Sequence, residues 1–369
     1  MALGDDTEGV AINPASVALR LPYSWTWWDY GFGVDFSVGA WLPKNDLYNQ
    51  GTEGGSGKSS ALFGSLAAIL YAGHFGVGAA AEAQSNAASR PQEDQGVARN
   101  FSANFGMVHS SAAYGFLDNQ LLIGVGGRFV GMSFDTRSSS SALSTAGAGY
   151  TAGVTYKPAA HQYRVAVAYK SRIRAEVPGD VGQAPSPVEV PWELALGFTY
   201  QFGKRVMNPR FVSVDEVARI AAGGAKPSKA DRERAERQLF EDYQGRQRRY
   251  VLVATELLVV QGNGDHVGVE RLWTERGTAS AARPVILPRL GVEAEVVPHV
   301  LRLRAGSYYE AERVNLKPVR IHGTGGLDVR LFRWNVFGLV KPFDYWQLSV
   351  AADVARAYLN TSFSIGFWH

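Results

Sequence analysis

Basic side chains are the residues of this sequence whose type and spacing could do chemistry. Between positions 162 and 176, Arg164, Lys170, Arg172 and Arg174 are interleaved with large apolar residues. Further cations fall on the same kind of alternating face: Arg128, Arg289, Arg302, Arg304 and Arg330. Carboxylates share that face: Glu193, Glu293, Glu295, Glu310, Asp328 and Asp353. Two interpretations stay open: the charges pair with one another, because buried charges must be paired, or some cations bind the carboxylate of a ligand.

Other candidate motifs are weaker. Residues 51–59 resemble a phosphate-binding loop, but Thr52 stands where that motif needs its first glycine, so we interpret them as an exposed Gly/Ser-rich loop. The 7 histidines are scattered, without the spacing of metal ligands, and no Ser/His arrangement indicates a nucleophile. We therefore predict no catalytic residue, no metal and no cofactor, and we predict that the protein is not an enzyme.

The segment 162–176 also predicts the element that positions these charges. Its large residues occupy one face of an extended chain: Tyr163, Val165, Val167, Tyr169 and Ile173. A period of two is a strand signal. The pattern recurs along nearly the whole chain in segments of about ten residues, which is typical of a transmembrane β-barrel with lipid outside and a polar lumen inside.

The alternation predicts an all-β fold, a transmembrane antiparallel barrel of about 14 strands. The expected strands cover 28–42, 61–72, 75–83, 101–107, 121–129, 147–157, 162–176, 192–202, 251–259, 285–297, 300–310, 323–334, 345–358 and 361–369. In the fourth strand, four residues are expected to face lipid: Phe101, Ala103, Phe105 and Met107.

Composition narrows the class. The 369 residues are 46% hydrophobic and 19% charged, and no apolar run reaches the roughly 20 residues that a membrane helix needs. A net charge of +3 is too small to indicate nucleic acid as a partner. The absence of cysteine suits an envelope protein without disulfides. No signal peptide is visible after Met1, so we expect the numbering to start at the mature protein.

Residues 204–248 interrupt the alternation and predict two helices. Ser213 opens a capping box with Glu216, and Ser228 caps a second, highly charged helix that ends near Gly245. The apolar stripe of this second helix is thin: Leu239, Phe240 and Tyr243. Counting strands from periplasmic termini places the insertion in the periplasm. It is either a solvated helical hairpin or a docking arm, and the sequence favours neither.

Residues 1–27 also lack the alternation, which predicts either a disordered tail or a plug inside the barrel. Their pattern of Asp5-Asp6 followed by Asn13-Pro14-Ala15 resembles the N-terminal hatch of FadL-type long-chain fatty acid transporters of the outer membrane. Four further segments resemble that family in the same order along the chain: Ala112–Gly126, Tyr163–Arg174, Pro191–Leu194 and Arg302–Gly306. The 204–248 insertion and a shorter chain depart from the family pattern.

The resemblance implies a hatch over 1–27, including Asp5, Asp6, Asn13 and Pro14, and a barrel over 28–369. It implies passive uptake of hydrophobic compounds such as long-chain fatty acids, which bind in the barrel and leave after the hatch shifts. The alternation adds candidate lumen ligands: Arg128, Arg164, Lys170, Arg172, Arg302 and Arg304. The expected location is the Gram-negative outer membrane, with lipid and lipopolysaccharide around the wall. The alternative is a structural barrel subunit of a multi-protein cell-envelope machine, which docks periplasmic or outer-membrane protein partners through 204–248.

Overall fold

The computed structural model of the chain describes most of the barrel and parts of its links. The described residues are 7, 9–20, 24–38, 59–91, 98–136, 143–175, 188–262, 267–268, 284–311, 319–333, 345–356 and 358–368. Asp5 and Asp6 of the expected hatch lie outside this set, as do residues 51–58 of the loop that resembles a phosphate-binding motif.

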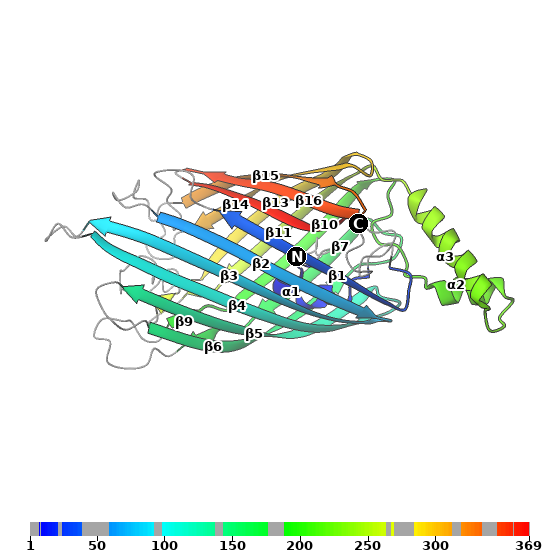
Figure 1. Ribbon diagram of the computed structural model, residues 1–369, viewed down its shortest axis with the longest axis horizontal. Helices are drawn as coiled ribbons and strands as arrows, with labels where there is room; N and C mark the ends of the chain where they lie inside the picture. Colours follow the sequence, from blue (N-terminus) through cyan, green and yellow to red (C-terminus); the bar gives the residue numbers. More distant parts are fainter. Residues whose placement is uncertain are drawn as a thin grey trace.

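Fourteen strands form one closed antiparallel barrel, which confirms the predicted fold (Figure 1). Pairing between β1 and β17, for example Val34 with Ile365, closes the ring. A closed barrel has no open strand edge, which is what allows strands to cross a membrane. The barrel strands are β1 (Trp28–Val38), β2 (Ser59–Ala72), β3 (Phe75–Pro91), β4 (Ala98–Phe116), β5 (Leu121–Thr136), β6 (Leu143–Tyr156), β7 (Tyr163–Lys170), β10 (Glu193–Gly203), β11 (Tyr250–Val260), β13 (Val285–Val297), β14 (Leu301–Ala311), β15 (Val319–Arg330), β16 (Tyr345–Ala355) and β17 (Tyr358–Trp368).

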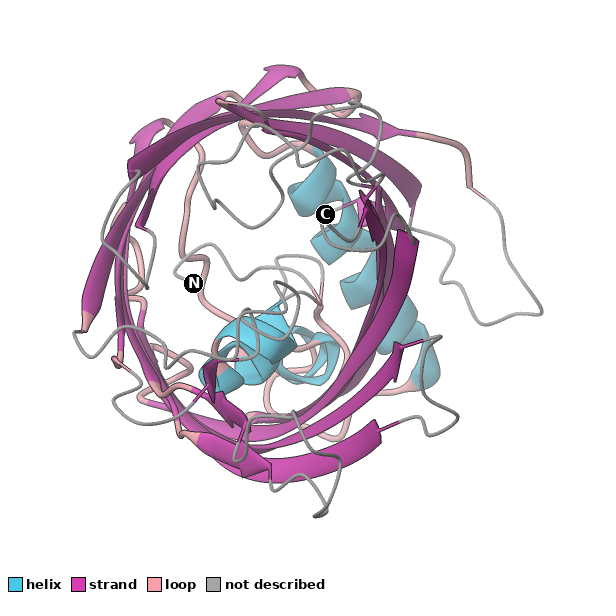
Figure 2. Ribbon diagram, turned by 90° about the vertical axis from the view of Figure 1, so that its left-hand side faces the viewer, coloured by secondary structure: helices cyan, strands magenta, loops and turns pink. Residues whose placement is uncertain are grey.

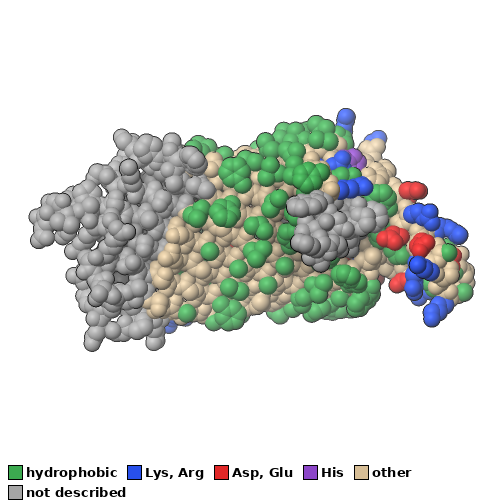
Figure 3. All heavy atoms as spheres, viewed as in Figure 1, with side chains coloured by type: hydrophobic (Ala, Val, Ile, Leu, Met, Phe, Trp, Pro, Cys, Tyr) green, Lys and Arg blue, Asp and Glu red, His purple; other side chains and the backbone are tan. Residues whose placement is uncertain are grey.

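The two faces of the wall follow the alternation of the sequence. On β7 and β10, the paired residues Val165 and Phe198 are both exposed, whereas Ala166, one position along, is buried toward the lumen. Large apolar side chains are spread over the visible wall, while charged side chains gather on the helices at one end (Figure 3). An apolar outer surface of this kind is what a lipid environment requires.

The structure corrects the predicted face of β4. Met107 is 8% exposed and is paired with Glu82, whereas its neighbour Val108 is 48% exposed. Directly paired residues share a face, so Met107 and, two positions earlier, Phe105 face the lumen and not the lipid. Side-chain size misled the prediction, because the lumen of this barrel also contains buried apolar residues.

The strand predicted over 162–176 is broken after Lys170. The next segment, β8 (Ile173–Ala175), joins β9 (Val188–Val190) and β12 (Val267–Gly268) in a separate three-stranded sheet. Ile173 was expected to face lipid but is 1% exposed. A Cβ at Gly147 or Gly149 would lie 2.6 or 2.8 Å from its side chain, so β8 packs against the lumen side of β6 where glycine leaves room.

Two short helical segments precede the barrel. α1 (Gly9–Ile12) and the 3-10 helix η1 (Pro14–Ala18) lie against the inner wall of the barrel. Seen end-on, the strands form a ring with helices in view inside its outline (Figure 2). η1 lies against β3, β4, β5 and β6. Because both segments are made of small or apolar residues, they can pack closely against a wall that offers little side-chain bulk.

Two longer helices project beyond one end of the barrel (Figure 1). They are α2 (Val214–Ala221) and α3 (Lys229–Gln244), at the end that also carries the short turns after β2, β4 and β13. Both predicted N-caps are confirmed: the Ser213 side chain accepts from the Glu216 N–H, and Ser228 forms a capping box with Asp231. None of the helices in the described ranges has the length and apolar character needed to cross a membrane.

Candidate functional site

Asn13 and Pro14 build the turn that holds the N-terminal segment in the lumen. The Asn13 carboxamide oxygen accepts from the Ala15 N–H at 3.0 Å, and its NH2 donates to Thr155 Oγ1 on β6 at 3.1 Å. Pro14 occupies the start of η1, where its missing N–H costs nothing. Asn13 and Ala15 are fully buried. This motif therefore joins the segment, hereafter the hatch (described residues 7 and 9–20), directly to the barrel wall.

Glycines on the inner wall form the seat of the hatch. At Gly124 on β5, an added Cβ would lie against the Pro14 carbonyl carbon and 2.5 Å from the Ala15 nitrogen. At Gly76 on β3 it would collide with the Val17 carbonyl. These contacts are to backbone, which cannot swing aside as a flexible side chain could. Only a residue without a side chain allows the hatch to come so close.

A cavity of about 660 Å³ lies between the hatch and the opposite wall. Gly9, Ala11 and Ile12 line it on the hatch side. The wall side contributes charged and hydroxyl side chains: Asp35, Ser65, Glu82, Glu293, Arg304, Asp328, Ser349 and Ser362. The volume is within the range of pockets that hold small molecules. The wall also contributes apolar side chains, among them Phe63, Ala67 and Ala80, so the space has a mixed lining in which charged groups lie on the wall side only.

The polar side is a network of paired charges on β13, β14 and β15. Arg304 Nε lies 2.8 Å from Glu293 Oε2, and Arg304 Nη2 lies 3.0 Å from Asp328 Oδ2. Arg302 lies 3.7 and 3.5 Å from the same two carboxylates, and Tyr250 donates to Glu293. Each carboxylate therefore faces two guanidinium groups, as buried charges require.

A second polar cluster lies further along the same strands, around His322, which is 1% exposed. Its Nδ1 is 2.8 Å from Asp353 Oδ1, its Nε2 is 2.9 Å from Glu310 Oε2, and Tyr308 stacks on its ring with centroids 4.2 Å apart. Arg320 pairs with Glu310 at 2.7 Å. Within the described ranges, no group of three His, Asp or Glu side chains is placed to hold a metal ion.

The six cations considered as ligand groups are not gathered at one point. Four of them face carboxylates: Arg302 and Arg304 as above, Lys170 with Glu193 at 3.5 Å, and Arg172 with Glu189 at 4.0 Å. Arg164 donates to Asn208 Oδ1 at 2.7 Å and to the Met207 carbonyl at 3.0 Å, so it anchors the chain that leads to α2. Of the six, Arg304 alone lines the cavity beside the hatch.

Arg128 differs from the other five. It is 2% exposed, and its contacts are long: 3.4 Å to the Ser171 carbonyl and 3.7 Å to Met107 Sδ. Its Nε has no hydrogen-bond partner among the described residues. The cross-strand neighbour of Arg128 is His109, which is 3% exposed. Neither ring nitrogen of His109 has a hydrogen-bond partner in the described part of the chain.

Glu82 connects this buried pair to the cavity. Its Oε2 lies 3.7 Å from His109 Nε2, and Glu82 itself lines the cavity. Neither Glu82 nor His109 was singled out from the sequence as a candidate ligand group. The alternation and the strand pairing could have identified them. Glu82 lies between the outward-facing Ala81 and Ala83, so it faces the lumen, and the β4 residues paired with that face of β3 point into the lumen as well.

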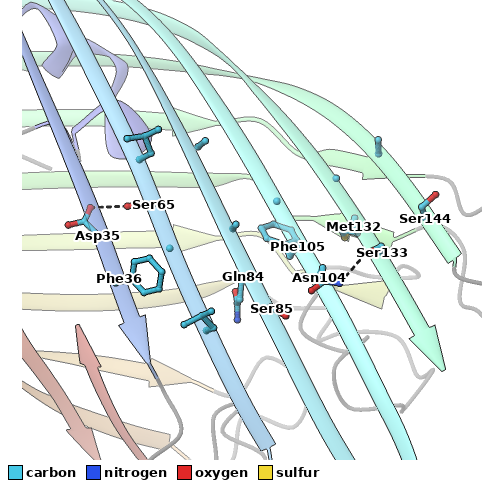
Figure 4. Close-up of a pocket in the computed structure, with 18 of the residues that line it drawn as sticks. Asp35, Phe36, Ser65, Gln84, Ser85, Asn104, Phe105, Met132, Ser133 and Ser144 are labelled. Atoms are coloured by element: carbon cyan, nitrogen blue, oxygen red, sulfur yellow. Dashed lines mark hydrogen bonds between the residues drawn. The ribbon is translucent and has the colours of Figure 1, made fainter. Parts of the chain in front are cut away.

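A second hollow, of about 970 Å³, lies on the wall formed by β1 to β6 (Figure 4). Most of its lining shares the face of the exposed Phe36, Leu62 and Leu66, so it is an outer groove and not part of the lumen. Small residues paired across five strands form its floor: Gly64, Ala83, Gly106, Gly131 and Ala146. Asn104 and Ser133 lie along its edge, 3.5 Å apart.

The protein is a closed 14-stranded antiparallel barrel with its N-terminal segment packed against the inner wall. Its fold matches the Ralstonia pickettii toluene transporter TbuX, with 13% identity, a TM-score of 0.55, and coverage of 98% of this chain and 94% of that one. It also matches the monoaromatic hydrocarbon channel CymD (13% identity, 0.55, 100% and 92%) and the Pseudomonas putida toluene transporter TodX (11%, 0.54, 98% and 93%).

These likenesses confirm the predicted FadL-type architecture at the level of the fold. No family model matches the sequence. No curated protein matches it either. Low identity over a full-length structural match means that the fold is shared while most individual side chains differ.

Proposed function

We propose that this protein is a passive channel of the Gram-negative outer membrane for hydrophobic compounds, long-chain fatty acids among them, and not an enzyme. The observation that carries the proposal is the cavity beside the hatch, with Ala11 and Ile12 on one side. A compound in this space touches the hatch itself, so binding and hatch displacement are linked. The likeness to channels named for toluene and monoaromatic hydrocarbons supports a hydrophobic cargo.

The polar end of a fatty acid needs a cation with spare hydrogen-bonding capacity, and Arg128 fits that need best of the six candidates. Arg302, Arg304, Lys170 and Arg172 already face carboxylates, and Arg164 is held by Asn208. Arg128 and His109 are buried donors with long or missing contacts, and charge-assisted bonds to a carboxylate would satisfy them. We infer that they receive the acid group, with Glu82 at the entrance from the cavity.

Uptake of two probes tests the proposal. Toluene and dodecanoate should enter proteoliposomes that contain the full chain, and deletion of Leu3–Leu19 should change the uptake of both. Arg128→Met should lower dodecanoate uptake about tenfold, the effect of losing a hydrogen bond to a charged group, and should spare toluene. Arg172→Met, which removes a cation that faces Glu189, is the matched control. If neither probe enters through the wild type, or if the deletion changes nothing, the proposal fails.

A second candidate function is a docking role for the projecting helices. Residues 214–244 contain 6 Lys or Arg and 7 Asp or Glu. Charged side chains of both signs beyond the barrel favour a partner whose surface carries complementary charges. Replacing 214–244 by a short Gly/Ser linker keeps Asn208 and Arg248 in place. The docking role predicts that proteins co-purifying with the wild type are lost from this variant; an unchanged set contradicts it.

A further inference from the structure

We propose that the α2–α3 hairpin is a latch on the hatch: it holds the segment that follows η1, and its release frees the hatch to move. The inference rests on the proposed function in that a movable plug is what makes a latch useful. It gives the hairpin a role inside the molecule, separate from any docking. Contacts of different kinds connect the hairpin and its links to Arg20 and Trp25, and a further contact connects the hairpin to the barrel wall.

The first contact is between backbones. The Val214 N–H, at the first position of α2, donates to the Trp25 carbonyl at 2.8 Å. The N–H groups of a first helical turn have no partner within their helix. Here one of them is used to hold the chain that leads from the hatch to β1, so the start of α2 fixes the position of Trp25.

The second contact is apolar. Trp25 is 6% exposed, and its ring centroid lies 6.2 Å from that of Tyr243 on α3. Leu239 and Phe240 pack against the same buried cluster, which also contains the hatch residue Val17. The thin apolar stripe of α3 is therefore partly buried and not fully exposed to solvent. It packs against this cluster beside Trp25, and the charged residues of α3 lie on its other faces.

The third contact anchors the hairpin to the barrel. Arg248 Nη1 donates to the Tyr243 hydroxyl at 3.2 Å, and Arg248 Nε lies 3.3 Å from Glu295 of β13. Both members of that ion pair are buried, so it resists separation more than an exposed pair would. At the other link, the Arg20 guanidinium of the hatch lies 4.3 Å from the Phe211 ring centroid. Hatch, hairpin and wall thus form one connected structure.

A proline substitution tests the backbone contact of the latch and keeps an apolar side chain at a position that packs against the same cluster. Val214→Pro deletes the N–H that reaches Trp25, while proline is favoured at the first helical position. The preceding Ser213 already has the extended conformation that proline demands (φ −84°, ψ 154°). Lys229→Pro is the matched control: it places proline at the first position of α3, after Ser228 in a similar conformation, where the side chain pairs only along its own helix with Glu233.

Hydrogen exchange of peptide 9–20, measured by mass spectrometry on the full chain in detergent, is the readout. Loss of one hydrogen bond should accelerate exchange of the hatch roughly threefold to tenfold in Val214→Pro, and Lys229→Pro should match the wild type. Tyr243→Ala, which leaves both helix caps intact, should accelerate hatch exchange as well. Wild-type hatch exchange in both Val214→Pro and Tyr243→Ala overturns the latch.

The outcome is separable from the proposed function. If the hatch responds to both substitutions but wild-type proteoliposomes admit neither toluene nor dodecanoate, the channel proposal fails and the latch stands. If uptake occurs and the hatch does not respond, the latch fails and the channel stands. Exchange of peptide 229–244 shows whether α3 itself remains folded. Equal acceleration of hatch exchange by Lys229→Pro with α3 still folded would also overturn the latch, because the hatch would then respond to a change that leaves its contacts with the hairpin intact.

Discussion

The two sides of the barrel wall present different groups to the lumen. The wall of β3 to β6 presents glycine to the hatch: Gly76 and Gly124 lie against hatch backbone, and Gly153 lies against the side chains of Asn13 and Pro14. The wall of β13 to β16 presents charges that pair with one another, such as Arg304 with Glu293 and Asp328. The first wall selects by shape. The charges of the second wall pair with one another, and the cavity lies between that wall and the hatch.

This difference explains where the cavity lies. A hatch of small apolar residues gains from close packing on glycine, because every added contact contributes dispersion energy. It gains nothing from a charged wall, since covering those groups would remove their water without offering new partners. The space of about 660 Å³ therefore opens on the charged side. The apolar surface of this space comes from Ala11 and Ile12 of the hatch and from wall residues such as Phe63 and Ala67.

The largest effect is expected from a side chain added to the glycine-bearing wall of β3 to β6, because it removes the space that the hatch occupies. Gly124→Val should expel the hatch, because its Cβ would lie 2.5 Å from the Ala15 nitrogen. We expect a cost at the upper end of the roughly 1–3 kcal/mol of overpacking, seen as about hundredfold faster exchange of peptide 9–20 and a raised bilayer conductance. Gly131→Val on the same strand, where no atom lies within 4 Å of the added Cβ, should change neither.

The charged wall should fail in a different manner. Glu293→Gln removes a carboxylate that faces Arg302 and Arg304, and should lower the free energy of unfolding by about 3 kcal/mol, the lower end for breaking a buried pair, since Asp328 remains. Urea unfolding in lipid vesicles measures the effect. Glu256→Gln is the control, because its partner Arg289 is half exposed and such pairs contribute below about 1 kcal/mol. Faster exchange of peptide 9–20 in Glu293→Gln would contradict the conclusion that the β3 to β6 wall, and not the charged wall, holds the hatch.

Much of this architecture could be predicted from alternation and capping signals. The strand pattern and the caps at Ser213 and Ser228 follow from local sequence, because each depends on residues within a few positions of one another. The closed barrel follows from the strands being expected to cross a membrane, where an open sheet edge is not tolerated. The face of β4 could not be read the same way. Its lumen side carries Met107, which is as apolar as a lipid-facing residue, so only the pairing with Glu82 decides the face.

The site depends on contacts between distant segments, and that is why less of it could be predicted. Gly124 is one of several small residues on its strand until Pro14 is found against it. Ile173 continues an alternating pattern, yet it packs against Gly147 because the chain leaves the wall after Lys170. His109 became a candidate only when its burial and its neighbour Arg128 were known.

The smallest effect should come from the hairpin, which lies beyond both walls. Hydrogen bonds from the Ser228 side chain and backbone lower the pKa of Asp231 below its ordinary value near 3.9. The ionised carboxylate therefore stabilises the start of α3 above about pH 4, and this stabilisation is lost as pH falls through the lowered pKa. Protection factors of peptide 229–244, corrected for intrinsic exchange, should drop a few-fold between pH 5 and 3, in keeping with the modest energy of a helix cap. Asp231→Asn cannot titrate and should flatten this dependence while the charged wall keeps its wild-type unfolding free energy. A variant as pH-sensitive as the wild type would assign the effect to another group.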